Sequence, residues 1–257
     1  MSIHPTAVVH PEAEVHPSAE IGPYSIIGPR VRIGAKNRIG PHVVVAQNTE
    51  MGEENQVFQF ASVGEVPQDL KYAGEQTRLV IGNRNIIREY ATLHIGTEGG
   101  GGLTQLGDGN LVMAYSHVAH DCTLGNGCIL ANAVNLAGHV NIGDCVIMGG
   151  LSAVHQFTRI GKHAFIAGGS MVTMDVPPYC IAQGDRAELA GLNKVGLTRH
   201  GFSPEQQERI KEAYRILFRS QLNLSDALAR LEATYQGHAE IEDFIHFISG
   251  SKRGITR

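Results

Sequence analysis

Histidines and an adjacent carboxylate gather in the middle of the chain, where His117, His120 and Asp121 are followed by His139 and His155. A histidine is close to neutral at physiological pH, so it can accept a proton from a hydroxyl group. A neighbouring carboxylate can fix the tautomer of that histidine and stabilise the imidazolium. No Ser or Cys stands in a recognisable nucleophile motif. The pattern therefore indicates direct transfer of a group to a bound acceptor, with a histidine as the general base.

Gly138, beside His139, adds to this chemistry. Because glycine has no side chain, its backbone N–H can approach the oxyanion of a reacting thioester closely. The alternative interpretation of the histidines is a polar ladder that satisfies backbone groups or bridges subunits. A single histidine on an exposed corner would not separate the two interpretations, whereas a column of them beside a carboxylate favours catalysis.

A six-residue repeat must position these side chains. An aliphatic residue recurs every six positions from Ile3 to Val172, and four places after it sits a small residue such as Ala13, Ser25 or Cys122. A unit of this length cannot bury its own face, so copies must stack. If both residues point inward, three units close a triangular coil of eighteen residues, and coils pair through backbone hydrogen bonds. The sequence therefore predicts a mainly β protein with a parallel β-helix over residues 1–182.

The repeat places the histidines on one edge of the coil. His120, His139 and His155 follow aliphatic positions that are eighteen residues apart. We therefore expect their side chains along one edge of three successive coils. His94 joins them if the second of two loops inserts between faces.

The two loops interrupt the repeat near residues 65–79 and 97–105. The first holds Gln68-Asp69-Leu70-Lys71-Tyr72, and the second holds four glycines from Gly99 to Gly102. Loops ejected from a regular solenoid indicate function. The glycines lack the Gly-Lys-Ser/Thr ending of a phosphate-binding loop, so we interpret them as a source of flexibility.

The repeat ends after Pro177-Pro178. We expect a linker over residues 183–202 and a helical domain over residues 203–257. Ser203 is a predicted N-cap and Gln206 completes a capping box. Further helices are expected from Ser225 and around residues 241–248. Their apolar stripes are expected to cap the open last coil or to dock neighbouring subunits.

The composition excludes several classes of protein. The 257 residues carry a net charge of -4 without a basic run, which argues against nucleic-acid binding. The repeat begins at Ile3 and no apolar stretch approaches the length of a membrane span, so we expect a cytoplasmic protein without membrane insertion. Cys122 and Cys128 occupy small inward positions, and Cys145 and Cys180 show no paired spacing. We therefore expect neither a disulfide nor a metal site.

Five motifs are far more specific than the repeat. They are His117-Val118-Ala119-His120-Asp121-Cys122, Gln68-Asp69-Leu70-Lys71-Tyr72-Ala73-Gly74-Glu75, Ala137-Gly138-His139-Val140, Val154-His155-Gln156-Phe157 and Asp175-Val176-Pro177-Pro178-Tyr179. Together they resemble the UDP-N-acetylglucosamine O-acyltransferase family, which begins lipid A synthesis. The resemblance spans nearly the whole chain, including the helical tail. It implies a homotrimeric left-handed β-helix with sites between adjacent subunits.

The resemblance also implies a reaction: transfer of a 3-hydroxyacyl group from acyl carrier protein to the glucosamine 3-hydroxyl of a UDP-sugar. No cofactor is implied besides the carrier thioester. The motifs match His120 to the general base, Asp121 to its orienting partner and Gly138 to the oxyanion donor. The family's groups that hold the sugar nucleotide or the donor match Asp69, Lys71, His117, His139 and Gln156. His155 lies in the same wall, and His94 is a further candidate. Asn193 and Arg199 match residues near the nucleotide.

Two positions depart from the family pattern, because Val195 and His200 stand where a Glu and a second Arg are familiar. Gly168 matches the position that stops the acyl chain in the family. We place Gly168 on the coil face that carries Val118, Leu136 and Val154. An acyl chain would run along this face. Met171 and Arg186 are the next candidates for setting acyl length.

Other functions remain open on the sequence alone. A γ-class carbonic anhydrase uses this coil with histidines on zinc, but its ligands include a His-x4-His pair, whereas this chain has His117-x-x-His120. The N-acyltransferase acting later in the same pathway would carry a domain before the repeats. A coenzyme A-dependent acetyltransferase, a 3-amino sugar acceptor and a non-enzymatic scaffold are the further alternatives.

Overall fold

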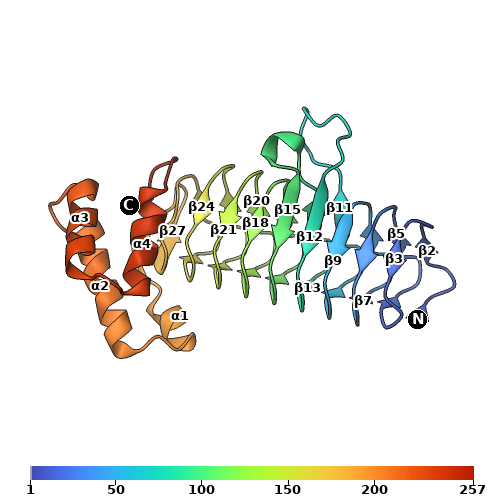
Figure 1. The fold of residues 1–257 in the computed structure, drawn as a ribbon, viewed down its shortest axis with the longest axis horizontal. Helices are drawn as coiled ribbons and strands as arrows, with labels where there is room; N and C mark the ends of the chain where they lie inside the picture. The colour runs from blue at the N-terminus through green and yellow to red at the C-terminus, as the bar shows by residue number, and fades with distance from the viewer. Residues whose placement is uncertain (1) are drawn as a thin grey trace.

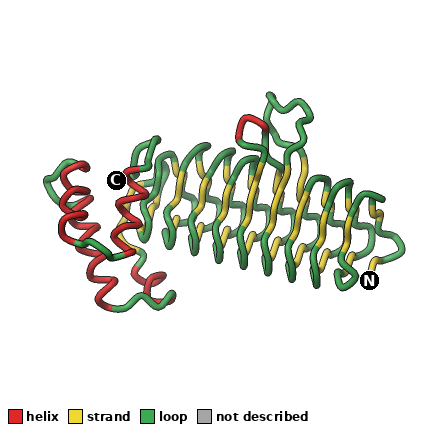
Figure 2. The backbone as a smooth tube through the Cα atoms, viewed as in Figure 1, coloured by secondary structure: helices red, strands yellow, loops and turns green. Residues whose placement is uncertain are grey.

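The computed structural model describes residues 2–257. The chain forms a left-handed parallel β-helix followed by a group of helices at its C-terminal end (Figure 1). Short strands and corners alternate along the whole β-helix (Figure 2). Three parallel sheets, here called A, B and C, make up its sides. The predicted fold class is therefore confirmed.

From β1 to β26, every third strand belongs to the same sheet, and β27 and β28 are added to the end of sheet A. Sheet A contains β1 (Ser2–Ile3), β4 (Glu20–Ile21), β7 (Arg38–Ile39), β10 (Gln56–Val57), β13 (Ile86–Ile87), β16 (Leu111–Val112), β19 (Ile129–Leu130), β22 (Ile147–Met148), β25 (Phe165–Ile166), β27 (Cys180–Gln183) and β28 (Glu188–Leu192). Sheet B contains β2 (Val8–Val9), β5 (Ile26–Ile27), β8 (Val44–Val45), β11 (Ser62–Glu65), β14 (Thr92–His94), β17 (His117–Val118), β20 (Asn135–Leu136), β23 (Ala153–Val154) and β26 (Met171–Val172). Sheet C contains β3 (Glu14–Val15), β6 (Arg32–Ile33), β9 (Thr49–Met51), β12 (Arg78–Ile81), β15 (Leu103–Leu106), β18 (Thr123–Leu124), β21 (Asn141–Ile142) and β24 (Arg159–Ile160).

The aliphatic residue of each repeat fills the interior. Val118, Leu136 and Val154 pair in register on adjacent strands of sheet B and are at most 2% exposed. Cys122 and Cys128 occupy small inward positions and are fully buried, as predicted. A continuous interior of this kind supplies most of the stabilising burial in a solenoid.

Most corners between two sheets have one position with positive φ. Along the edge between sheets B and C this position is held by Asp121, His139 and Phe157, with φ of 59°, 62° and 63°. Each of these residues lies three places after the inward aliphatic residue. Corner side chains of successive coils therefore stack above one another along the edge.

The two loops leave the coil where the sequence predicts. The first connects β11 to β12, and the second connects β14 to β15 and contains the short 3₁₀ helix η1 (Glu98–Gly100). Both loops extend from the same side of the β-helix (Figure 1). Because Leu93 pairs with Val118 across β14 and β17, the second loop inserts between faces and keeps His94 on sheet B.

The segment expected to be a linker contains regular structure. β28 pairs antiparallel with β27, and α1 (Lys194–Arg199) follows. Three helices complete the chain: α2 (Pro204–Phe218), α3 (Leu224–Thr234) and α4 (Ala239–Ser249). The predicted capping box of Ser203 and Gln206 is present at the start of α2. Helix α3, expected from Ser225, begins one residue earlier at Leu224 and is capped by Asn223.

Helix α4 packs against the last coils. The Arg159 guanidinium lies 4.5 Å from the Phe247 ring centroid, and the Lys162 ammonium lies 2.6 Å from a carboxylate oxygen of Asp243. The hydroxyl of the buried Tyr179 also donates to Asp243. The predicted capping of the open coil by helices is therefore confirmed. Within residues 2–257, no helix combines the length and apolar character needed to cross a bilayer.

Candidate active site

His120 and Asp121 form the centre of the site. His120 Nδ1 and Asp121 Oδ2 are 2.8 Å apart. The Asp121 side chain is 1% exposed and that of His120 is 13% exposed. The carboxylate accepts two further hydrogen bonds, from the Thr97 backbone N–H at 2.8 Å and the Thr97 hydroxyl at 2.6 Å. As an ionised carboxylate only accepts, the Nδ1 of His120 is the protonated nitrogen and Nε2 is left with its lone pair.

The glycine-rich loop wraps around Asp121. Gly96 and Gly100 lie against the Asp121 carboxylate, where any Cβ would collide with it. Gly99, between them, has open space around it. The interpretation of the run from Gly99 to Gly102 as a source of flexibility is therefore incomplete: Gly100 must be a glycine because its backbone approaches a buried carboxylate.

Gly138 lies on the Nε2 side of the His120 ring. A Cβ on residue 138 would fall 2.5 Å from Cε1 and 2.7 Å from Nε2 of His120, so only glycine fits. Within residues 2–257, the Gly138 N–H donates to no protein acceptor. A backbone donor thus remains available beside the basic nitrogen, as an oxyanion site requires.

Three more histidines surround this pair. The His139 ring lies at 90° to His120 with centroids 5.1 Å apart, and His94 and His117 form a similar pair at 4.8 Å. Burial, assisted by the nearby His117 and His120, lowers the pKa of His94 to about 4. Burial also lowers the pKa values of His117 and His139. These neighbours are therefore neutral at pH 7 and do not repel a transient charge on His120.

The structure confirms only part of the predicted histidine column. His139 stacks face to face on Phe157 at 4.3 Å, so Phe157 takes the position expected for His155. His155 lies at the same edge, but its Nδ1 accepts a hydrogen bond from the Arg253 guanidinium at 2.8 Å. His120, His139 and His155 lie two, three and one residues after their aliphatic residues. The side chains that stack at the corner lie three residues after the aliphatic residue, so among these histidines only His139 occupies that position.

The first loop contributes at least one predicted residue to this edge. The Asp69 carboxylate is close enough to act on the charge of His139. Lys71 and Gln156 are exposed, and their side chains make no hydrogen bond within the described residues. They are free to contact a ligand.

Asn193 and Arg199 lie on a different edge. Asn193 is 7% exposed and caps α1: its Oδ1 accepts from the Gly196 N–H, and its Nδ2 donates to the His163 carbonyl. These bonds give the Asn193 side chain a structural role. Arg199 is exposed and lines a cleft of about 340 Å³ together with Val195 and His200. The floor of this cleft comes from sheet A, whereas His120 lies at the edge between sheets B and C.

The placement of Gly168 on the face of sheet B is wrong. Gly168 follows β25 of sheet A and lies in the corner that leads to sheet B. Met171, by contrast, belongs to β26 of sheet B and is 38% exposed. Arg186 lies in the loop between β27 and β28, whose Ala187 N–H donates to the Met171 carbonyl at 2.9 Å. All three candidates for acyl length therefore gather at the C-terminal end of sheet B.

Four residues near the site were missed from the sequence. Thr97 donates hydrogen bonds to Asp121, and Phe157 stacks on the His139 ring. Lys252 and Arg253 line a groove of about 680 Å³ together with His139 and Phe157. The corner spacing could have identified Phe157. The others come from a loop and from the C-terminus, so no repeat spacing connects them to His120.

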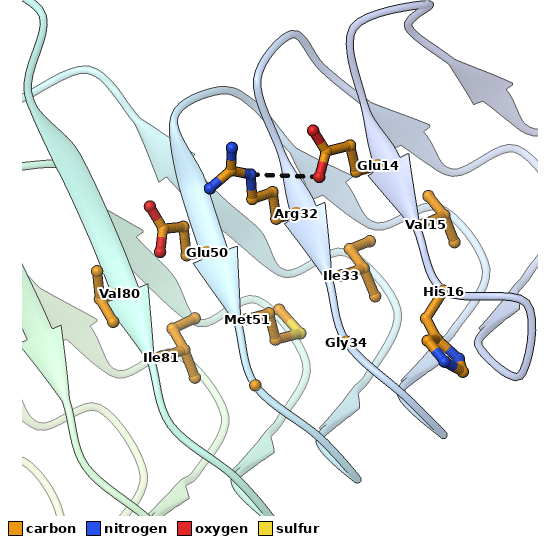
Figure 3. Close-up of a pocket in the computed structure, with 11 residues that line it drawn as sticks. Glu14, Val15, His16, Arg32, Ile33, Gly34, Glu50, Met51, Val80 and Ile81 are labelled. Atoms are coloured by element: carbon orange, nitrogen blue, oxygen red, sulfur yellow. Dashed lines mark ion pairs between the residues drawn. The ribbon is translucent and has the colours of Figure 1, made fainter.

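A separate hollow of about 570 Å³ lies near the N-terminus on sheet C (Figure 3). The Arg32 guanidinium and the Glu14 carboxylate are 3.4 Å apart at its rim. None of the histidines described above lines it. This hollow is therefore distinct from the candidate active site.

Comparisons with known proteins agree with the geometry. Residues 175–256 match the family described as UDP-N-acetylglucosamine O-acyltransferase, domain 2, and residues 103–138 match the bacterial transferase hexapeptide repeat. The acyl-[acyl-carrier-protein]–UDP-N-acetylglucosamine O-acyltransferase of Myxococcus xanthus is 66% identical over 209 residues, covering 81% of each chain. The enzyme of the same name from Anaeromyxobacter sp. strain Fw109-5 is 55% identical over 257 residues, covering both chains completely. The solved UDP-N-acetylglucosamine O-acyltransferase of Moraxella catarrhalis is 46% identical, with a TM-score of 0.98 over 100% of both chains. The chain therefore belongs to the UDP-N-acetylglucosamine O-acyltransferase family.

Proposed function

We propose that this protein transfers a 3-hydroxyacyl group from acyl carrier protein to the 3-hydroxyl of UDP-N-acetylglucosamine, the first step of lipid A synthesis. The family and the names of the relatives support the substrates. The observation that carries the mechanism is the buried Asp121–His120 pair with the free Gly138 N–H beside it.

In the proposed reaction His120 acts as a general base. Its Nε2 takes the proton of the sugar hydroxyl while the hydroxyl oxygen attacks the thioester carbon. The Gly138 N–H donates to the oxygen of the tetrahedral intermediate. Collapse of the intermediate breaks the C–S bond, and the imidazolium returns its proton to the departing thiolate. Asp121 stabilises the imidazolium between these two proton transfers.

We infer that the site is completed by a second copy of the chain. Outward positions on sheet A are polar at the N-terminal end but apolar in six later strands, which cover the coils of the histidines and extend beyond them to β27. The apolar positions are Ile86, Leu111, Ile129, Ile147, Phe165 and Ile181, and each is half-buried. A continuous apolar stripe on a sheet face marks an interface between proteins. The expected homotrimer, in which each copy contacts the next, would cover this stripe.

This assembly would also bring the two halves of the site together. The cleft beside Arg199 is lined by Ile147, Phe165 and Ile181 of the stripe. A neighbour that covers the stripe would therefore bring its own surface to this cleft. We propose that the neighbour presents its histidine cluster there, so that one chain holds the nucleotide end of the substrate while the other carries out the chemistry.

The acyl chain would follow the outer face of sheet B. Asn135, Ala153 and Met171 occupy outward positions in consecutive strands after His117. At about 4.8 Å for each coil, three coils separate the site from Met171 by about 14 Å. Lys252 and Arg253 at the adjacent groove would attract an acidic carrier. The cytoplasmic location stays a prediction.

A donor and acceptor screen tests this function. The purified protein is offered the same 3-hydroxyacyl group on acyl carrier protein and on coenzyme A, with UDP-N-acetylglucosamine or its 3-amino analogue as acceptor. Product mass and linkage identify the reaction. We expect transfer from the carrier to the 3-hydroxyl. Preferred use of coenzyme A, or of the 3-amine, would replace this proposal with the corresponding alternative.

A further inference from the structure

Three side chains with metal-binding atoms meet on the edge between sheets C and A. The Sγ of Cys145 and one ring nitrogen each of His163 and His200 all lie within 4.8 Å of one another. Cys145 and His163 hold the positive-φ corner positions of successive coils, with φ of 57° and 56°, so they stack. His200 reaches them from the C-cap of α1, which lies beside the end of the β-helix (Figure 1).

Both histidines have nitrogens available for a ligand. His200 Nδ1 lies 2.9 Å from the Gly196 carbonyl oxygen. A carbonyl only accepts, so Nδ1 carries the proton and Nε2 keeps its lone pair, the arrangement usual for a metal-binding histidine. The Nδ1 of His163 is buried and has no hydrogen-bond partner in the described residues. The two rings lie 4.8 Å apart at 70°, too steeply inclined to stack face to face.

We propose that Cys145, His163 and His200 form a three-ligand site for a thiophilic divalent cation of the Zn²⁺ type. One thiolate and two imidazoles suit Zn²⁺, with solvent in the fourth tetrahedral position. The Cys145 thiol releases its proton to solvent as the S–Zn bond forms, and no electron transfer is involved. Metal–ligand bonds of about 2.0–2.3 Å require the ligand atoms to close by roughly 1 Å. The His200 side chain, at the exposed end of a short helix, can make this movement.

The ion would link the C-terminal segment to the β-helix. Cys145 and His163 belong to the coil, whereas His200 ends α1 and leads into α2. A metal bridge between them would raise the thermal stability of the folded chain, because the unfolded chain holds no such arrangement. His200 also lines the cleft beside Arg199, so the ion would lie at the wall of the proposed nucleotide cleft. The acyl transfer does not pass through this ion, and the tests below measure metal binding itself rather than turnover.

Cobalt binding tests the site in the intact protein. After removal of metals with a chelator, Co²⁺ is titrated while the near-ultraviolet thiolate-to-cobalt charge-transfer band is recorded. We expect a band that saturates at one ion per chain, is absent from Cys145→Ser, and persists in the matched controls Cys122→Ser and Cys180→Ser. The cluster of His120, Asp121 and His139 also has metal-binding atoms within 4.8 Å of one another, but it contains no thiol and cannot give this band.

His200→Ala provides a variant that keeps the thiol and changes an exposed residue. We expect this variant to bind Co²⁺ at least about 10-fold more weakly than the parent. Zn²⁺ should raise the melting temperature of the parent and leave that of His200→Ala almost unchanged. The proposal is overturned by metal binding without a thiolate band, by a band that survives in Cys145→Ser, or by equal affinity of His200→Ala and the parent.

Discussion

Gly100 lies directly against the carboxylate of Asp121, at a distance that excludes any side chain on residue 100. Gly99, its neighbour in the same 3₁₀ helix, has no atom within 4 Å of where its Cβ would be. The two glycines therefore have different roles although the sequence presents them as one run. This difference provides a matched pair of variants for testing the proposed role of the Asp121 carboxylate in orienting His120.

We predict that Gly100→Ala lowers turnover roughly 10- to 100-fold, the loss typical of removing a group that orients a reacting side chain. The added methyl displaces Asp121, which then no longer holds the His120 tautomer. Gly99→Ala should retain parental turnover. Steady-state kinetics of the two variants provide the measurement, and equal turnover of the pair would show that Asp121 does not need its observed position.

Acid should destabilise the protein through its buried histidines. Burial holds the pKa of His94 at about 4, below the ordinary value of 6.5. As pH falls below 6.5, the unfolded chain takes up a proton that folded His94 does not, so the free energy of unfolding decreases down to about pH 4. At pH above 6.5 both states are neutral and this effect disappears.

The variant His94→Gln isolates this contribution. Urea unfolding between pH 7 and pH 4 should give a shallower loss of stability for His94→Gln than for the parent. His10→Gln, at an exposed position in the first coils, is the matched control. Parallel pH profiles for His94→Gln and the parent would show that His94 takes up its proton equally in both states.

Hybrid trimers test whether two chains share one site. His120→Ala removes the proposed base from one subunit, and Arg199→Ala alters the proposed nucleotide cleft on another. Each variant alone should be nearly inactive, whereas a mixture refolded together should recover part of the parental activity. We choose Arg199 because Asn193 caps α1 and its loss would disturb the fold. Absence of recovery in mixed trimers of confirmed composition would place the whole site within one chain.

Gly168 can be substituted to test acyl length. A Cβ there would lie 3.3 Å from the Gly150 carbonyl oxygen, so a side chain fits with a small adjustment. Gly168→Met should favour donors several carbons shorter, because the added side chain would narrow the corner between sheets A and B, which a long acyl chain would have to pass. A panel of 3-hydroxyacyl donors measures the preference. An unchanged rank order would move the determinant to Met171 or Arg186.

The repeat made the β-helix predictable because every inward position constrains residue type. The same regularity located His120 and His139 on one edge. Outward positions carry no such constraint, so the apolar stripe of sheet A becomes visible only when strands from different coils are placed side by side. The stripe is the structural reason to expect subunit contacts.

Contacts made by loops and by chain ends could not be read from the repeat. Thr97 reaches Asp121 across 24 residues and Arg253 reaches His155 across 98. His200 approaches Cys145 only because α1 folds back beside the coil. His155 was misplaced in the histidine stack because its offset from Val154 is one residue, whereas the stacked corner position lies three residues on.

The most direct test of the account is the turnover of His120→Ala with 3-hydroxyacyl carrier protein and UDP-N-acetylglucosamine. Hydrodynamic size and melting temperature should first establish that the variant assembles and folds like the parent. The account predicts a loss of about 10²- to 10⁴-fold in turnover, the contribution typical of a general base. A folded His120→Ala protein of parental assembly that turns over at near-parental rate would contradict it.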